Sequence, residues 1–204
     1  MNKSFALFWI TIFLIGAGCS KKFESPPASN HASPEAVANS LSTVKAEDYV
    51  DLFKYDPTLP IDIQEDQRSQ QSSLIQIDFT YASPKGGRVP ARMVLPEGTG
   101  PFPGLILQHG GLGNFEDFTM LAKILAGYGT VVLMINDPYS RSGGWQPTQY
   151  MGATWPYYTA QDLEYKIQYI TDLRRAVDIL VARPEVDPKR LAYWCNSYGG
   201  AMGG

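Results

Sequence analysis

Three short apolar segments of strand type, separated by segments with helical periodicity, place the strongest constraint on the fold of this chain. They are residues 104–108, 130–135 and 190–195. Strands that alternate with helices form βαβ units, in which a crossover helix joins two parallel strands. We therefore predict an α/β fold with a mostly parallel sheet and helices on both of its faces.

The segments between these strands carry the expected helix signals. Asn114 and Thr159 are typical N-cap residues, and each has an aspartate three positions later. Gly127 and Gly129 should end the first helix, and Pro184 with the Asp187-Pro188 turn should end the second. The predicted apolar stripes are Phe118, Leu121, Leu125 and Tyr128 in the first helix, and Leu163, Ile167, Ile170, Leu173, Val177 and Leu180 in the second.

Two further strands are predicted before the alternating region. Residues 74–81 alternate in part between apolar and polar side chains, and residues 88–95 follow a turn of the sequence SPKGG. We expect an antiparallel hairpin at an edge of the sheet.

The last predicted strand leads directly into a serine that is flanked by small residues. The order Cys195-Asn196-Ser197-Tyr198-Gly199 resembles the nucleophile elbow G-x-S-x-G, in which a tight strand-to-helix turn exposes the serine hydroxyl. Small residues are needed two positions before and after the serine, because larger side chains would collide with the neighbouring backbone. Cys195 replaces the first glycine of the pattern and is still small. The alternative is an ordinary Ser/Gly turn between a strand and a helix.

A glycine-rich loop, His109-Gly110-Gly111-Leu112-Gly113, follows the strand at 104–108. Acyl transfer to a serine creates an oxyanion, which needs N–H donors held about 3 Å away. In a site of this kind one donor is the amide that follows the nucleophile, here Tyr198, and the other comes from this loop. We expect Gly111, or next Leu112, to be the second donor. We expect His109 to order the loop rather than to act as general base, and Cys195 to be buried under the elbow.

Together these motifs resemble the α/β-hydrolase superfamily over about residues 74–204. The stretches that carry the resemblance are QHGG at 108–111, NDPYSR at 136–141, DLRRAVD at 172–178, RPEVDPKR at 183–190 and the elbow. The chain is most similar to the branch of dienelactone hydrolases, acetyl xylan esterases and acylaminoacyl-peptidase-like proteins. The resemblance implies that the loop at 137–141 lies at the rim of the site. The aromatic loop that continues to Tyr158 either walls the acyl pocket or packs over the sheet.

In this fold the chain order is serine, then acid, then histidine. The two histidines of the sequence, His31 and His109, both precede Ser197. We therefore expect the fold to be incomplete after the elbow, with the triad acid and histidine beyond Gly204. A serine hydroxyl without a base is a poor nucleophile at neutral pH. The 204-residue chain alone is expected to be inactive and poorly folded.

The N-terminus has the organisation of a secretory signal. A basic start is followed by the apolar run 5–15 and by Gly16-Ala17-Gly18-Cys19, which resembles a bacterial lipobox although Gly16 stands where leucine is preferred. We predict a lipoprotein signal peptide at 1–18, lipidation of Cys19, a flexible tether at 19–46 and a catalytic domain from residue 47. Ser20 favours the outer membrane. The alternative is an ordinary signal peptide with an incidental cysteine.

Composition excludes several other function classes. The net charge of −3 gives no basic surface for nucleic acid, and two cysteines cannot form a disulfide framework. The sequence has no metal-ligand cluster, phosphate loop or dinucleotide fingerprint, so we expect no metal and no cofactor.

Two functions remain open from sequence. The first is a serine hydrolase that cleaves a small-molecule ester through an acyl-enzyme on Ser197, with a peptidase of the acylaminoacyl-peptidase type as the variant within enzymes. The second is a naturally short, non-catalytic lipoprotein or binding remnant held at the membrane. The sequence leaves the oligomeric state undetermined.

Overall fold

The computed structural model describes residues 47, 49–111, 113–143 and 160–203. Predictions for the signal peptide, Cys19, the tether, Leu112 and the loop at 144–158 lie outside these residues. The elements, in chain order, are η2 (Val50–Phe53), β1 (Gln64–Gln71), β2 (Leu74–Ala82), β3 (Arg88–Pro96), β4 (Phe102–Gln108), η3 (Phe115–Phe118), α2 (Thr119–Gly127), β5 (Val131–Ile135), α3 (Ala160–Val181), β6 (Val186–Cys195) and α4 (Tyr198–Gly203). No helix among the described residues is long and apolar enough to span a membrane.

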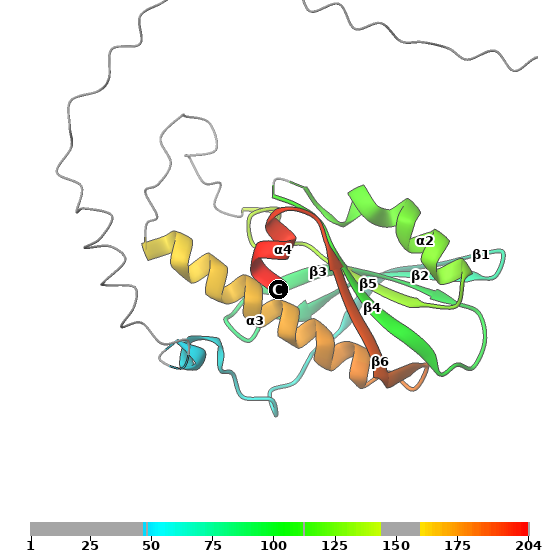
Figure 1. Cartoon of the computed structure of the whole chain (residues 1–204), viewed down its shortest axis with the longest axis horizontal. Coiled ribbons are helices and arrows are strands. Elements are labelled where there is room, and N and C mark those ends of the chain that lie inside the picture. Colours follow the sequence, from blue (N-terminus) through cyan, green and yellow to red (C-terminus); the bar gives the residue numbers. More distant parts are fainter. Residues whose placement is uncertain (1–46, 48, 112, 144–159, 204) are drawn as a thin grey trace, which may run out of the picture. The chain divides into compact units, whose positions relative to one another are not determined.

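The strands form one six-stranded sheet in the order β1-β2-β3-β5-β4-β6 (Figure 1). The sheet is mixed: β4 pairs in parallel with both β5 and β6, whereas β1, β2, β3 and β5 pair in an antiparallel manner. The two kinds of pairing follow from the connections. Short turns join β1 to β2 and β2 to β3, and helices join the strands from β4 onward.

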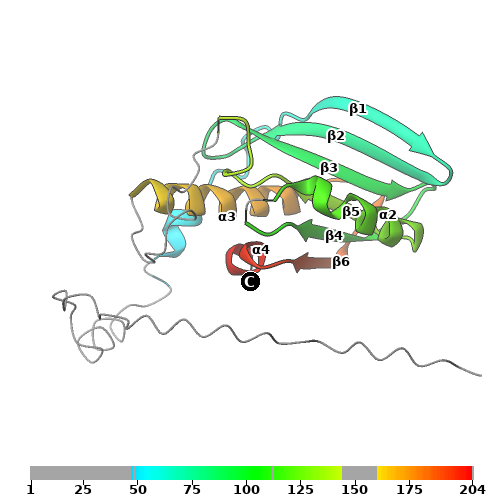
Figure 2. The ribbon, with the colours of Figure 1, turned by 90° about the horizontal axis from the view of Figure 1, so that it is seen from above.

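The two crossover helices cover opposite faces of the sheet (Figure 2). The chain moves from β4 to its neighbour β5 through α2, then returns past β4 to β6 through α3. Since crossovers are right-handed, reversing the direction across the sheet places the second helix on the other face. The predicted helices on both faces are therefore confirmed.

Strand β5 shows how the two cores share the sheet. Val131, Leu133 and Ile135 face the α3 side and belong to the larger core. Val132 and Met134 face the α2 side and pack against Ala122 and Ala126, among others. All five β5 residues are fully buried, which explains why the strand is apolar throughout instead of alternating.

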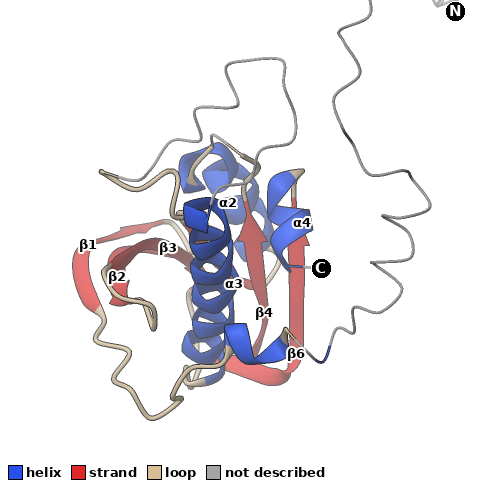
Figure 3. Cartoon of the chain, turned by 90° about the vertical axis from the view of Figure 1, so that its left-hand side faces the viewer, coloured by secondary structure: helices blue, strands red, loops and turns tan. Residues whose placement is uncertain are grey.

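The helices begin and end close to the predicted positions, but their buried stripes differ. Asn114 forms the capping box with Asp117, although the cap belongs to the 3-10 turn η3 that precedes α2. Tyr128 lies just after α2 and is 86% exposed. In α3, Leu163 and Val177 were expected inside and are exposed, whereas Tyr169 and Ala176 are buried. Figure 3 shows α3 running across one face of the sheet.

The predicted hairpin is confirmed as the pair β2–β3, but it does not form the edge of the sheet. An additional strand, β1, pairs with the outer side of β2. Its sequence, QEDQRSQQ, is entirely polar, and no β1 side chain is buried. Because β1 is held by backbone pairing rather than by a core face, the hydrophobic pattern could not reveal it.

The last strand also differs from its prediction. β6 begins at Val186 rather than Arg190, and the Asp187-Pro188 turn forms an irregularity within it, where the register with β4 shifts. The strand was expected to be buried, yet Trp194 is 46% exposed. The physical reason is that β6, in the described part of the chain, pairs with β4 alone and lies at the sheet edge.

Candidate active site

The site residues predicted from sequence converge at the carboxyl ends of β4 and β6. These strands are parallel neighbours, and Gln108 pairs with Cys195 at their ends. The chain leaves β4 toward α2 on one face, and it leaves β6 toward α4, whose Met202 packs on the core of the other face. A crevice between two parallel strands whose connections diverge is the usual ligand position in open α/β sheets.

Ser197 occupies a sharp turn between β6 and α4. Its φ angle is +48°, in the left-handed region, and its side chain is exposed. The turn is closed by hydrogen bonds from Gly199 N to Asn196 O (2.9 Å) and from Gly200 N to Ser197 O (3.0 Å). A non-glycine residue in this region is strained and persists only where the surroundings fix it. The predicted tight turn between a strand and a helix is present, and the role of Ser197 as nucleophile stays a prediction.

Close contacts in the structure explain why the residues around Ser197 are small. A Cβ on Gly199 would lie 2.6 Å from the carbonyl oxygen of His109. Cys195, which replaces the usual glycine, is half-buried rather than buried, and its Sγ would lie 3.2 Å from a Cβ on Gly200. The elbow accommodates Cys195 because residue 200 is also a glycine.

The glycine-rich loop packs directly against the elbow. A Cβ on Gly110 would lie 3.4 Å from Ser197 Cβ and 3.3 Å from Asn196 Nδ2. A turn from Gly113 N to Gly110 O, 3.2 Å, shapes the loop, and Gly111 is exposed within it. The loop backbone at Gly110 therefore lies next to the serine, and the role of Gly111 as a donor stays a prediction.

His109 is almost fully buried, and both of its ring nitrogens have backbone partners. Nδ1 lies 2.7 Å from the carbonyl oxygen of Gly110, and Nε2 accepts the N–H of Asp137 at 3.3 Å. Because a carbonyl can only accept, Nδ1 carries the hydrogen. The Nε2 lone pair is then occupied by the amide. His109 thus joins the loop after β4 to the loop after β5, and this geometry favours the ordering role over that of general base.

The loop at 137–141 follows β5 and is fixed by a buried ion pair. Arg141 Nη2 lies 2.6 Å from Asp172 Oδ2, and Arg141 also donates to the carbonyl oxygen of Asn136. Asp172, in α3, is fully buried. Burial raises the pKa of Asp172, and the charge of Arg141 partly offsets that rise. Asp172 lies in the stretch 172–178 that carries the family resemblance, and no role was predicted for it from the sequence.

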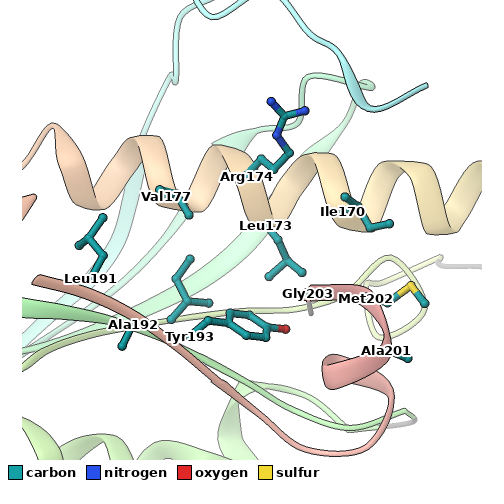
Figure 4. Close-up of a pocket in the computed structure, with 11 residues that line it drawn as sticks. Ile170, Leu173, Arg174, Val177, Leu191, Ala192, Tyr193, Ala201, Met202 and Gly203 are labelled. Atoms are coloured by element: carbon teal, nitrogen blue, oxygen red, sulfur yellow. The ribbon is translucent and has the colours of Figure 1, made fainter. Parts of the chain in front are cut away.

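An apolar groove of about 510 Å³ lies beside the elbow helix, between α3, β6 and α4 (Figure 4). Ile170, Leu173 and Val177 point from α3 toward Tyr193 and Met202. Ser197 is not among the described residues that line the groove, so the groove does not include the predicted nucleophile. Elsewhere in the described residues, no group of three or more His, Cys, Asp or Glu side chains is placed to hold a metal ion.

Comparison with known proteins gives one family match. Residues 54–203 match the family model described as acetyl xylan esterase (AXE1). No match is found among curated protein sequences.

Several solved structures are similar to this one. An acetyl xylan esterase from Paenibacillus sp. R4 is 23% identical with a TM-score of 0.57, over 76% of this chain and 51% of that one. Acetyl xylan esterase 1 from Thermoanaerobacterium sp. JW/SL YS485 is 21% identical with a TM-score of 0.55, over the same shares of 76% and 51%. A glucuronoyl esterase from Solibacter usitatus is 13% identical with a TM-score of 0.50, over 81% of this chain and 55% of that one. These likenesses confirm the α/β-hydrolase fold, and the chain spans about half the length of the structures it matches.

Proposed function

Because the chain belongs to the acetyl xylan esterase (AXE1) family, we propose that the protein is a carboxylic-ester hydrolase with Ser197 as its nucleophile. The observation that supports this most directly is the exposed Ser197 at φ +48°, between a strand and a helix. The Gly110 backbone lies beside Ser197, which supports a second amide donor from this loop.

In the proposed reaction Ser197 Oγ attacks the carbonyl carbon of the ester and gives its proton to a general base. The amides of Tyr198 and Gly111 stabilise the negative charge that forms on the carbonyl oxygen. The C–O bond to the alcohol then breaks, the alcohol leaves with the proton, and an acyl-enzyme remains. Water attacks the acyl-enzyme by the reverse sequence and releases the carboxylic acid and Ser197.

We place the general base and its acid partner after Gly204, in a longer form of the protein. His109 cannot serve without giving up its bond to Asp137 N, because its Nε2 lone pair is already used there. Small acetyl esters and acetylated xylan are the first substrates to test, since the similar structures are named acetyl xylan esterases.

A lipid anchor at Cys19 also remains a proposal, with the outer membrane as the location. The intact mass of the protein extracted from membranes tests both this anchor and the length of the chain. A mass equal to residues 19–204 plus lipid would establish a short lipoprotein, and the catalytic role of Ser197 would fall. A clearly larger mass would direct the search for acid and histidine to the additional residues.

The second candidate is a non-catalytic lipoprotein. The observation in its favour is that no described histidine faces Ser197 with a free ring nitrogen.

Activity decides between the two candidates. The native protein should hydrolyse p-nitrophenyl acetate and should be labelled by a fluorophosphonate at Ser197, whereas Ser197→Ala should lose both by at least about 10³-fold. Ser140→Ala is the matched control, a nearby serine whose bonds lie within its own loop. Equal turnover by the wild type and Ser197→Ala would exclude the proposed mechanism.

A further inference from the structure

Four tyrosines gather behind the elbow, and the residue that follows the nucleophile is one of them. Tyr198 stacks on Tyr169 of α3, with ring centroids 5.9 Å apart and planes 26° apart. It meets Tyr139 edge-on, with centroids 5.8 Å apart. Tyr139 in turn stacks on Tyr165 of α3 at 5.3 Å. The cluster therefore joins the elbow, the loop after β5 and α3.

The partners of Tyr198 are themselves held firmly. Tyr169 is fully buried in the larger core. Tyr139 is 6% exposed and lies in the loop that Arg141 joins to the buried Asp172. The Tyr198 hydroxyl also donates to the Tyr139 hydroxyl at 3.3 Å. Offset-stacked and edge-on aromatic pairs stabilise a structure beyond the effect of the area that they bury.

The same residue that carries this packed ring also carries a backbone group of the proposed site. The Tyr198 N–H is the first proposed oxyanion donor, and it belongs to the peptide unit that links the strained Ser197 to Tyr198. A strained residue keeps its conformation only when the structure on both sides of it is fixed. The backbone before Ser197 is fixed by the bond from Asn196 N to Gln108 O, 3.0 Å. After Ser197, hydrogen bonds from Gly199 N and Gly200 N close the turn, and the Tyr198 ring packs against Tyr139 and Tyr169.

We propose that Tyr198 is a positioning residue, whose ring, held between Tyr139 and Tyr169, orients the Ser197–Tyr198 peptide so that its N–H faces the developing oxyanion. The role rests on the proposed ester hydrolysis. It assigns a function to the Tyr198 side chain, whereas the hydrolytic mechanism itself uses only the backbone of this residue.

The first turn of α4 has a second attachment that makes the test selective. Tyr193 of β6 donates its hydroxyl to the carbonyl oxygen of Gly199 at 2.6 Å. Since this bond remains when Tyr198 is changed, α4 should stay folded in a Tyr198 variant. A defect would then come from the orientation of the elbow peptide rather than from loss of the helix.

The test compares Tyr198→Phe, Tyr198→Leu and Tyr128→Leu in the native protein. Phe keeps the ring stacking and loses only the hydroxyl pair. Leu loses the ring. Tyr128→Leu is the matched control, because Tyr128 is 86% exposed and lies at the end of α2. Two quantities are measured: kcat per active site, titrated with a fluorophosphonate, and amide hydrogen exchange in residues 196–203.

We expect Tyr198→Leu to lower kcat per titrated site about tenfold or more with little change in KM, since loss of one oxyanion donor costs about 10²–10³ in kcat. Its elbow amides should exchange faster, whereas Tyr198→Phe and Tyr128→Leu should stay within about threefold of wild type. A purely structural role would reduce the number of titratable sites but leave kcat per site unchanged, and that result would overturn the proposal.

The two proposals fail in different ways. If the wild type has no Ser197-dependent esterase activity, the proposed function is wrong. Hydrogen exchange still tests the anchoring in that case, and unchanged protection of residues 196–203 in Tyr198→Leu would overturn it independently of activity.

Discussion

At the scale of single residues, the elbow depends on a few close contacts, and the local sequence predicts only some of them. The C-x-S-x-G pattern predicted a tight turn at Ser197, and its positive φ agrees with that prediction. The pattern also required a small residue at 199, for which the structure supplies the obstacle, the carbonyl of His109. The pairing of Tyr198 with Tyr139 and Tyr169 could not be predicted, because these residues are far apart in sequence and have no shared periodicity.

Gly199→Ala should destabilise the protein by about 1–3 kcal/mol, the usual cost of overpacking a filled site. The added Cβ would lie 2.6 Å from a backbone oxygen, which has little freedom to move. Chemical denaturation would measure the loss in the free energy of unfolding.

Gly127→Ala is the matched control for this change. Nothing lies within 4 Å of a Cβ at Gly127, the last residue of α2, so alanine there should be neutral or mildly stabilising. Equal stability of the two variants would show that the elbow relaxes around residue 199.

At the scale of elements, the sequence predicted those whose pattern reflects burial and missed those held by backbone pairing. β4, α2, β5 and α3 were predicted from apolar runs or helical spacing, and each buries a face against a core. β1 was missed because a polar edge strand has no buried face. The stripe of α3 was displaced because Tyr169 and Ala176 pack inward where Leu163 and Val177 were expected. Hydropathy alone does not distinguish a tyrosine that faces a core from one that faces solvent.

The pair Arg141–Asp172 joins the loop after β5 to α3. The loss of stability caused by breaking this pair should depend on pH. Arg141→Met leaves the fully buried Asp172 without its counter-charge, which costs about 3–5 kcal/mol at neutral pH. Burial already raises the pKa of Asp172, and removal of Arg141 should raise it further.

The sign of the pH dependence follows from this raised pKa. A carboxyl group with a folded pKa above its unfolded value loses stability as pH rises through the interval between the two. Since the unfolded pKa is the same in both proteins, the deficit of Arg141→Met against wild type should shrink as pH falls through the folded pKa values of Asp172, which lie above the unfolded value of about 3.9. Chemical denaturation at several pH values tests this pH dependence.

Arg190→Met is the control. It breaks an ion pair that is half exposed at the arginine and should cost no more than about 1 kcal/mol. A deficit for Arg141→Met that is constant with pH would contradict the assignment to the charge of Asp172.

At the scale of the whole molecule, the described sheet is covered unevenly. Strand β5 is buried on both faces of the sheet. Strand β6, in the described residues, pairs with β4 alone and exposes Trp194. Apolar side chains are also exposed on the helices of both faces, namely Met120, Ile124 and Tyr128 in or just after α2 and Val177 and Val181 in α3. The groove of about 510 Å³ adjoins the same strand. Monomeric soluble proteins seldom leave an exposed strand edge beside an apolar groove.

The 204-residue chain, produced by itself, should therefore fold poorly and associate through this surface. We expect a broad thermal transition, binding of a hydrophobic dye and no Ser197-dependent ester turnover.

Trp194→Lys should reduce association, because a charge on an edge strand opposes pairing with another chain. Gln70→Lys, on the polar edge strand β1 at the opposite side of the sheet, should leave association unchanged. Calorimetry and sedimentation would measure these properties. A sharp cooperative transition of a monomer, together with Ser197-dependent turnover, would show that these 204 residues suffice for both the fold and the chemistry, and Ser197 would then need a base within them.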